Sequence, residues 1–271
     1  MTGRPVTGAF RPSGPALCDN SLRVAVACDR VPPALAALAV GVPPAPPGTG
    51  ARRAAILVGD GLDRDGLTRL LAGEAGFVVE ADESPPAASS PDPGLSPDPG
   101  LSPDPGWTRV VVPQALFALS LSTRTSWTAQ PAAAVCDALV LLGVLDGDSR
   151  GTVELCLHEA VANAIVHGNL GIASAAKNHP EGYETFGRLL SERLADPRRR
   201  RLRLTVAARW ADGWLDITVV DEGQGFDLAL LPRAADGNSR SGRGFVFMRA
   251  LAAGVDVCDG GRCTRLRFAL T

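Results

Sequence analysis

The chain has 271 residues, a formal net charge of −2 and a sequence pI near 5.9, and 45% of its residues are hydrophobic. That apolar fraction is enough for a buried core, so we expect a soluble globular protein. The balanced charge excludes the overall basic excess that draws a chain to nucleic acid or to acidic lipid. We therefore expect neither partner, and we expect any anionic ligand to be bound locally.

Cysteine usage and the apolar runs predict a cytoplasmic protein. The six cysteines form no CxxC pair, and several lie in apolar runs where a free cysteine behaves as a small hydrophobe. No unbroken apolar stretch of the signal-peptide type opens the sequence. The longest apolar runs, Val31 to Val42 and Ala132 to Leu145, are shorter than the ~18 residues of a membrane span. We expect reduced thiols and no transmembrane helix.

A strand, a loop, a helix and a second strand are predicted between Arg53 and Ala81, and Leu22 to Asp29 predicts a further strand of the same small sheet. This segment resembles the opening of a response-regulator receiver domain. The acidic pair expected after the first strand is reduced to Asp60, and no later strand brings a phosphoacceptor aspartate. The resemblance implies a degenerate receiver-like α/β segment over residues 1–84 that accepts no phosphoryl group. An unrelated βαβ fragment is the alternative.

Residues 85–106 separate this segment from the rest of the chain. A six-residue unit, LSPDPG, recurs there in tandem within the run PPAASSPDPGLSPDPGLSPDPG. Proline fixes φ and glycine loosens the chain, so this composition builds no packed core and predicts a linker or a surface loop. We therefore expect a second domain over residues 107–271.

After the linker, the pattern predicts alternating groups of strands and helices. The expected elements are strands at Arg109 to Val112 and Leu116 to Leu121, helices at Ala132 to Leu142 and about Ser149 to Gly168, an insertion with a helix at Tyr183 to Leu194, strands at Leu202 to Trp210 and Trp214 to Asp221, a helix at Gly244 to Ala253 and a final hairpin of Val255 to Val257 with Thr264 to Leu270. Asp212 and Gly213 supply the positive φ angles of a tight hairpin. This order implies a mostly antiparallel sheet with helices on one face, an α+β two-layer sandwich.

The segment HEAVANAIVHGN, His158 to Asn169, has a polar and an apolar face if it is an α-helix. At about 100° per residue, Glu159, Asn163 and His167 fall within an arc of about 80°, opposite the apolar side chains. His158 lies outside that arc and is expected to be structural. The polar face indicates a binding site, and the alternative is that these side chains only cap their neighbours.

Two glycine-containing segments follow along the chain. VVDEGQGFD, Val219 to Asp227, ends a predicted strand at Asp221 and continues into two glycines that let the backbone approach a ligand closely. SGRGFVFMRAL, Ser241 to Leu251, places two glycines before a predicted helix whose first amide groups suit phosphate oxygens. Taken alone, each of these segments is also typical of an ordinary turn that binds no ligand.

Taken in order, the three segments resemble the asparagine-bearing helix, the DxGxGF box and the GxGxxxM box of the histidine-kinase-like (GHKL) ATPases. Gly260, Gly261 and Thr264 stand where those proteins usually carry a glycine and threonine motif before the last strand. The variant EAVANAIVHGN is most similar to the bacterial anti-sigma factor serine kinases. The resemblance implies the GHKL ATPase fold for residues 107–271, with ATP and Mg²⁺ as cofactors.

The resemblance also implies roles for single residues. Asn163 would give Mg²⁺ a side-chain oxygen, and Asp221 would accept a hydrogen bond from the exocyclic amine of adenine. Glu159, one helical turn before the metal ligand, would be the catalytic general base. The full expected nucleotide-binding set is Asn163, His167, Gly168, Asp221, Gly223, Gly225, Phe226, Gly242, Arg243, Gly244 and Thr264.

Three functions are consistent with these residues. The first is an anti-sigma serine kinase that phosphorylates or sequesters a protein partner, such as an anti-sigma antagonist or a sigma factor. Its oligomeric state is left open by the sequence, with a homodimer as one option. The second is the catalytic module of a two-component histidine kinase, and the third is a nucleotide-dependent binding module without catalysis. The arginine run Arg198 to Arg201 is expected to be a solvated loop, with a docking patch for an acidic partner as the alternative.

Overall fold

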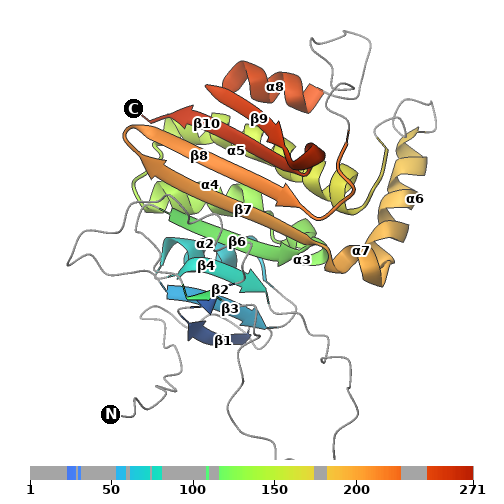
Figure 1. The fold of residues 1–271 in the computed structure, drawn as a ribbon, viewed down its shortest axis with the longest axis horizontal. Coiled ribbons are helices and arrows are strands. Elements are labelled where there is room, and N and C mark those ends of the chain that lie inside the picture. Colours follow the sequence, from blue (N-terminus) through green and yellow to red (C-terminus); the bar gives the residue numbers. More distant parts are fainter. Residues whose placement is uncertain are drawn as a thin grey trace, which may run out of the picture.

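A mixed sheet of eight strands carries most of the described chain (Figure 1). The computed structural model describes residues 23–28, 30–31, 53–58, 62–73, 75–80, 108–109, 116–173, 182–226 and 243–270. The strands are β1 (Arg23–Cys28), β2 (Arg30–Val31), β3 (Arg53–Val58), β4 (Ala75–Glu80), β5 (Thr108–Arg109), β6 (Leu116–Ser122), β7 (Arg203–Ala211), β8 (Trp214–Asp221), β9 (Gly254–Cys258) and β10 (Cys263–Ala269). The helices are α2 (Arg64–Ala72), α3 (Thr123–Thr128), α4 (Pro131–Leu141), α5 (Gly147–Ala162), the π-helix η1 (Asn163–Asn169), α6 (Gly182–Ala195), α7 (Pro197–Arg201), α8 (Arg243–Leu251) and the 3₁₀-helix η4 (Asp259–Gly261).

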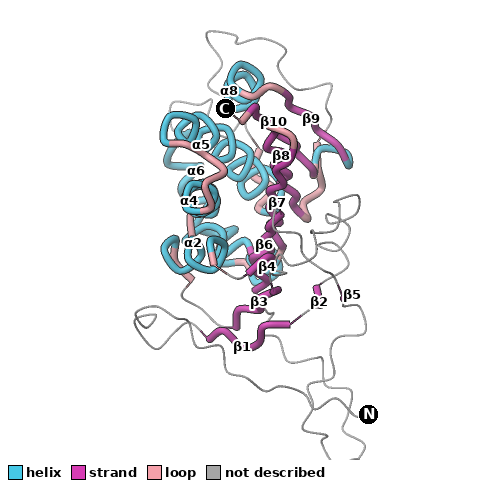
Figure 2. Tube along the Cα trace, turned by 90° about the vertical axis from the view of Figure 1, so that its left-hand side faces the viewer, coloured by secondary structure: helices cyan, strands magenta, loops and turns pink. Residues whose placement is uncertain are grey.

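The sheet and its helices form two layers. The strand order is β1-β3-β4-β6-β7-β8-β10-β9, and α2, α4, α5 and α6 all lie on one side of the sheet when it is viewed edge-on (Figure 2). Between the layers, Leu139 and Leu157 from the helices meet Val206 and Ile217 from the sheet, and all four side chains are fully buried. The predicted α+β two-layer sandwich is confirmed.

The β7–β8 hairpin has the predicted alternation and the predicted turn. Asp212 and Gly213 have φ angles of 52° and 77°, which is the left-handed backbone that a tight hairpin needs. The turn sets a register in which Leu204 on β7 lies opposite Asp221 on β8. On the face away from the helices, Asp216 forms an ion pair with Arg267 at 2.9 Å. One face of the hairpin is therefore core, and the other is polar.

Three of the four described strands in residues 1–84, namely β1, β3 and β4, belong to the same sheet as the rest of the chain, whereas β2 pairs with β5 in a separate two-stranded sheet. The strand, helix and strand predicted between residues 53 and 81 are β3, α2 and β4, and β4 pairs in parallel with β6. Leu67 and Leu71 of α2 are fully buried in the core that α4 and α5 share. The sheet and the core thus continue across the predicted linker, which itself lies outside the described residues. The boundaries at 84 and 107 and the likeness to a receiver domain stay predictions.

Two sequence-based expectations differ from the structure. The helix predicted from about Ser149 to Gly168 begins at Gly147, and its last part widens at Asn163 into the π-helix η1. The run Arg198 to Arg201 was expected to be a loop, but it is the short helix α7. Asp196 caps this helix and Pro197 occupies its first turn, a combination that starts a helix even before a run of like charges.

Within the described ranges, no helix is both long enough and apolar enough to cross a lipid bilayer.

A chain of ion pairs ties the N-terminal helix α2 to α4 and α5. The carboxylate of Asp137 on α4 forms ion pairs with Arg64 of α2 and Arg150 of α5, each with an N–O distance of 2.6 Å. Arg150 also forms an ion pair with Glu154 at 2.5 Å. Partial burial raises the pKa of Asp137, but hydrogen bonds from the two guanidinium groups outweigh this and hold it below its usual value. Folding therefore favours the ionised carboxylate.

We expect Asp137→Ala to lower the free energy of unfolding by about 1 to 2 kcal/mol at pH 7, because two half-buried arginines lose their shared partner. A carboxyl whose pKa is lowered by folding adds stability above its ordinary pKa, and that stability is lost as the pH falls through the folded value. Urea denaturation should therefore show the largest difference near neutral pH and a smaller one in acid.

The matched control is Glu192→Ala, which removes the exposed Arg188–Glu192 pair on α6. Exposed pairs of this kind contribute little, so a change below about 0.5 kcal/mol is expected. Equal effects of the two substitutions would contradict a structural role for the Asp137 network.

Candidate functional site

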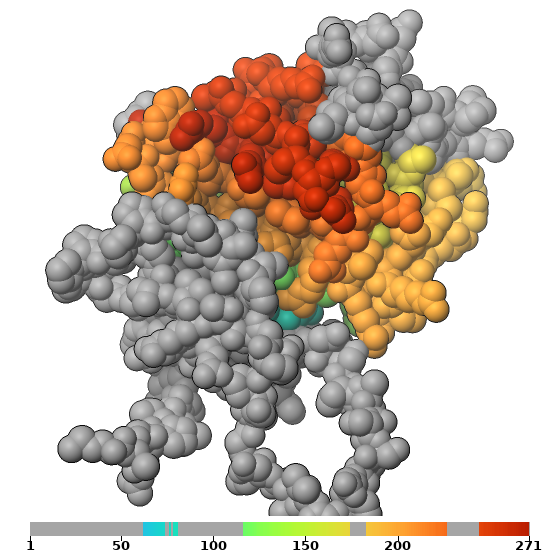
Figure 3. Space-filling model, in the orientation of Figure 1, coloured from blue at the N-terminus to red at the C-terminus, as the bar shows by residue number. Residues whose placement is uncertain are grey.

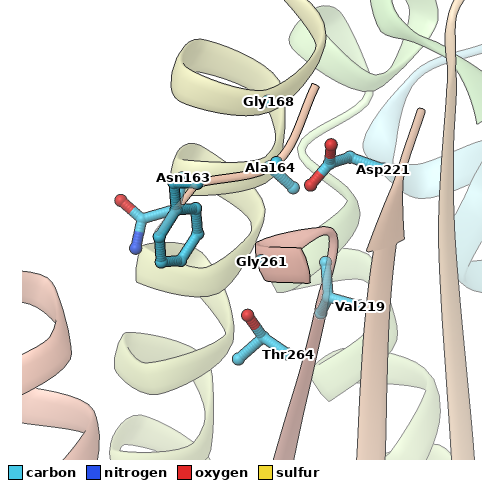
Figure 4. Close-up of a pocket in the computed structure, with 9 residues that line it drawn as sticks. Asn163, Ala164, Gly168, Val219, Asp221, Gly261 and Thr264 are labelled. Carbon is cyan, nitrogen blue, oxygen red and sulfur yellow. The ribbon is translucent and has the colours of Figure 1, made fainter. Parts of the chain in front are cut away.

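A pocket lies between the end of α5, the π-helix η1 and the strands β8 and β10 (Figure 4). Its volume, including the opening to solvent, is about 290 Å³. The residues that line it are Asn163, Ala164, Gly168, Val219, Asp221, Gly225, Phe226, Gly261 and Thr264. The structure thus gathers six of the predicted site residues, from three separate sequence segments, around one space.

Asp221 is the buried acid of this pocket. It is the last residue of β8, only 7% of it is exposed, and its backbone N–H donates to the carbonyl oxygen of Arg262 at 3.0 Å. Its Oδ1 accepts a hydrogen bond from the Gly223 N–H at 2.8 Å, and the carboxylate is directed into the pocket (Figure 4). Burial raises the pKa of Asp221 to about 6, although the Gly223 hydrogen bond opposes that rise.

Glycines allow the end of the π-helix to touch the end of β8. A Cβ atom on Gly168 would collide with the Asp221 carboxylate, and one on Gly223 would collide with the Gly168 backbone. Gly225 has a φ of +72°, and a Cβ there would overlap the carbonyl oxygen of Gly260. Side chains at these positions would push the two walls of the pocket apart, so the geometry depends on glycine at each.

Asn163 lines the pocket as well, and Glu159 lies close to it but is not among the described residues that line the pocket. These residues are four apart on α5 and at its end, so they share a face of the helix. The Asn163 amide extends away from Asp221 (Figure 4). Glu159 lies against the start of α8, because a Cβ on Gly244 would collide with the Glu159 carboxylate. The pocket is thus lined by a buried acid and by an amide, and Glu159 lies one helical turn from that amide.

Thr264 and Phe226 complete the walls. Thr264 on β10 is 7% exposed, pairs in register with Val219 of β8, and turns its hydroxyl toward the pocket (Figure 4). The backbone N–H of Phe226 donates to the Gly260 carbonyl oxygen at 2.9 Å. Its ring meets that of Phe245 edge to face, with 5.9 Å between the ring centroids, and so connects this wall to α8.

The remaining predicted residues lie elsewhere. The Nδ1 atom of His167 is 2.6 Å from the carbonyl oxygen of Ile172, so its ring holds the segment after the helix, and it is not among the described residues that line the pocket. Arg243 and Gly244 begin α8, and Gly242 lies outside the described residues.

Asn169 is a structural residue of the site for which the sequence predicted no role. It is fully buried, and its Nδ2 donates to the Thr123 hydroxyl at 2.9 Å and to the Arg203 carbonyl oxygen at 3.0 Å. Its Oδ1 accepts the N–H of Glu222, the residue after Asp221, at 2.9 Å. The amide thus joins α3, β7 and the end of β8 behind the pocket. The position of this asparagine directly after His167 and Gly168, at the end of the helix, was the sequence signal that could have indicated its structural role.

Arg199 supports the same region from α7. Its guanidinium donates to the carbonyl oxygens of Asn169 and Leu170, at 3.1 and 2.7 Å. These oxygens belong to the last turn of a helix, where backbone acceptors lack partners within the helix. One member of the arginine run is therefore part of the scaffold and not only a solvated charge.

A model of the histidine kinase-like ATPase domain matches residues 126–269, which is more than half of the chain and includes every residue that lines the pocket. The chain therefore belongs to the histidine kinase-like ATPase domain family. A comparison with curated proteins finds no match. Domains of this family bind ATP, generally with Mg²⁺, and the pocket is the place in this chain that the family motifs enclose.

The residues present fit such a ligand. The buried carboxylate of Asp221 and the hydroxyl of Thr264 are a polar pair that suits the edge of a purine, and the glycine contacts leave backbone free to approach a flat ring. Among the described residues, no group of three or more His, Cys, Asp or Glu side chains is placed to hold a metal ion. A Mg²⁺ ion here would therefore take most of its ligands from phosphate and water, as Mg²⁺ commonly does.

Gly168→Ala should weaken ATP binding at least tenfold, because the added methyl group displaces the Asp221 carboxylate. Isothermal titration calorimetry measures this effect. Gly151→Ala in α5, the helix that leads into η1, is the matched control, since nothing lies within 4 Å of a Cβ at that position. It should leave ATP affinity unchanged and raise stability by about 0.5 to 1 kcal/mol. Normal ATP affinity in Gly168→Ala would show that this contact does not shape the site.

Proposed function

We propose that this protein is an ATP-dependent regulator of the anti-sigma serine kinase type, which phosphorylates or sequesters a protein partner in a bacterial signalling switch. The observation that carries the proposal is the pocket that the buried Asp221 and Asn163 both line, with Glu159 one helical turn before Asn163 and against the start of α8. The part of the site around Asp221 suits a nucleobase, and the part around Asn163 and Glu159 suits phosphates. The expected partner is an anti-sigma antagonist or a sigma factor.

In this proposal Asp221 selects adenine. Its ionised carboxylate accepts a hydrogen bond from the exocyclic amine, and Thr264 provides a hydroxyl beside it. Hydrogen bonds to a charged group are stronger than those between neutral groups, and this one forms in a buried place. A guanine ring carries a carbonyl oxygen where adenine carries its amine, so the same carboxylate disfavours GTP by placing two acceptors together.

Asn163 and Glu159 have different roles in the part of the site that suits phosphates. The side-chain oxygen of Asn163 would hold Mg²⁺, which would neutralise negative charge on the phosphates. Glu159 accepts the proton of a partner's serine hydroxyl while the serine oxygen bonds to the γ-phosphorus and the bond from that phosphorus to the ADP oxygen breaks. The contact of Glu159 with the first turn of α8 supports this role, since it fixes the carboxylate beside the GxGxxxM segment.

Asp221→Asn should have opposite effects on binding and on stability. ATP affinity should fall about ten- to a hundredfold, because the charged acceptor is lost. Folding raises the pKa of Asp221 to about 6, so the ionised group lowers the stability of the native state as the pH rises from 3.8 through about 6. At pH 7 the neutral variant should therefore melt at the same or a higher temperature. Calorimetry and thermal denaturation measure the two effects.

The same titration makes ATP affinity depend on pH. Affinity should decrease as the pH falls through about 6, because the protonated carboxyl is a poorer acceptor. Asp221→Asn is the control, since the phosphates of ATP titrate equally with both proteins. A parallel pH profile in the two proteins would exclude Asp221 as the adenine acceptor.

Glu159→Gln and Asn163→Ala should separate catalysis from binding. With labelled ATP and a candidate antagonist protein, Glu159→Gln should reduce phosphoryl transfer at least about a hundredfold while ATP affinity stays within about threefold. Asn163→Ala should weaken binding of Mg-ATP much more than binding of ATP measured with a chelator present, because only the metal complex uses the amide oxygen.

Each alternative function has its own outcome in this experiment. Transfer to a serine that survives Glu159→Gln excludes this residue as the base. Nucleotide-dependent partner binding without transfer favours the non-catalytic module, and acid-labile label on a partner's histidine favours a histidine kinase. Unchanged Mg-ATP affinity in Asn163→Ala removes that residue from the site.

A further inference from the structure

Two cysteines face each other at the ends of β9 and β10. Cys258 is the last residue of β9, Cys263 is the first of β10, and the two are directly opposite in the antiparallel register. Both are free thiols, and their side chains share a hydrogen bond. Opposed residues of neighbouring strands have Cβ atoms about 4.5 to 5.5 Å apart, which is close to the spacing of a disulfide.

The pair lies on the other side of the strand from the pocket. Successive side chains of a strand point to opposite faces, so Cys263 points away from the face that carries Thr264 and the pocket. The outer face of β7 to β10 reaches the molecular surface (Figure 3). Cys258 is half-buried, whereas Cys136 and Cys156 are fully buried in the core. Cys263 is buried, with 6% of it exposed, so a small oxidant reaches the pair through Cys258 and is excluded from the core thiols.

The turn between the two cysteines forms part of the pocket. Its Gly260 carbonyl oxygen accepts the N–H of Phe226 at 2.9 Å, and its Arg262 carbonyl oxygen accepts the N–H of Asp221 at 3.0 Å. Gly261 lines the pocket directly. Asp259, Gly260 and Gly261 have consecutive φ angles of 51°, 59° and 93°, all in the left-handed region. The pocket wall thus depends on a turn whose two ends are the cysteines.

We propose that Cys258 and Cys263 are a reversible oxidation site whose disulfide weakens nucleotide binding. The effect on nucleotide binding rests on the proposed function. Formation of the disulfide between the two cysteines does not. Bringing two Cβ atoms from the spacing of opposed strand residues to the ~3.8 Å of a disulfide draws the ends of the turn together. The movement is transmitted through the backbone to the carbonyl oxygens that hold Asp221 and Phe226, without any group entering the pocket.

The oxidant in this step is a low-molecular-weight disulfide. The thiolate of Cys258 attacks one sulfur of that disulfide, and the first small thiolate leaves. Cys263 then loses its proton and attacks the Cys258 sulfur, and the second small thiolate leaves and takes up a proton. The two cysteines lose two electrons and two protons, and the small disulfide becomes two thiols. Cys258 is the first nucleophile, because burial and the hydrogen bond with Cys258 raise the pKa of Cys263 to about 12.

The covalent step is tested by peptide mapping of the full chain. After treatment with oxidised glutathione and blocking of free thiols, trypsin cuts after Arg249, Arg262 and Arg265, so the two cysteines fall in the separate peptides 250–262 and 263–265. The disulfide joins these peptides, and dithiothreitol separates them. We expect this cross-linked pair to form in wild type and to be absent in Cys258→Ser. If oxidised wild type yields no such pair, the site is overturned.

The effect on the pocket is tested by calorimetry with ATP on the same samples. Oxidised wild type should bind ATP about tenfold more weakly than reduced wild type, with recovery after dithiothreitol. Cys258→Ser should bind like the reduced protein under both conditions. Cys28→Ser is the matched control, because its position in β1 lies at the opposite edge of the sheet, and it should retain the full response to oxidation.

The outcomes distinguish this inference from the proposed function. Cross-linking with unchanged affinity overturns control of the pocket by the cysteine pair. An oxidation effect that persists in Cys258→Ser also overturns it. If neither the reduced nor the oxidised protein binds ATP although the peptides are joined, the nucleotide site and its control both fail, and the dithiol chemistry stands.

Discussion

The contact of Gly168 with Asp221 is the constraint on which the rest of the site depends. It brings the end of the π-helix against the end of β8, at a distance that leaves no room for a Cβ atom. The carboxylate is buried by this contact, and burial is what raises its pKa to about 6. Asn169, the next residue after Gly168, then ties the same helix end to α3, β7 and the residue after Asp221. One close approach thus sets the shape and the electrostatics of the pocket.

The N-terminal segment strengthens this scaffold from the far edge. Its strand β4 extends the sheet beside β6, and Arg64 of α2 joins the ion pairs that hold α4 and α5 together. The same helix α5 carries Glu159 and leads into Asn163, so the segment supports the helix on which these two residues lie. Its place in the sheet gives a structural reason for its presence that does not require phosphoryl transfer to it.

In the proposed function, nucleotide binding and phosphoryl transfer depend on different parts of the site. The adenine part is built from β8, β10 and the turn between Cys258 and Cys263, which are joined by backbone hydrogen bonds. The phosphate part is built from α5 and the start of α8, which meet at Glu159 and Gly244. A change in the turn is therefore expected to act on nucleotide affinity, whereas a change between the two helices is expected to act on transfer.

Sequence patterns predicted most of the helices and strands and six of the residues that line the pocket. The period-two pattern gave the β7–β8 hairpin, the glycine positions marked the close approaches, and the motif order indicated which residues meet. Only the tertiary structure decided that residues 53–80 continue the same sheet, because strand pairing across a long separation leaves no local signal. It also decided that the helix ends in a π-helix, that His167 contacts the carbonyl oxygen of Ile172, and that Asn169 is buried. The partners of Asn169, Thr123 and Arg203, lie far from it in the sequence, so no local pattern could predict their contact.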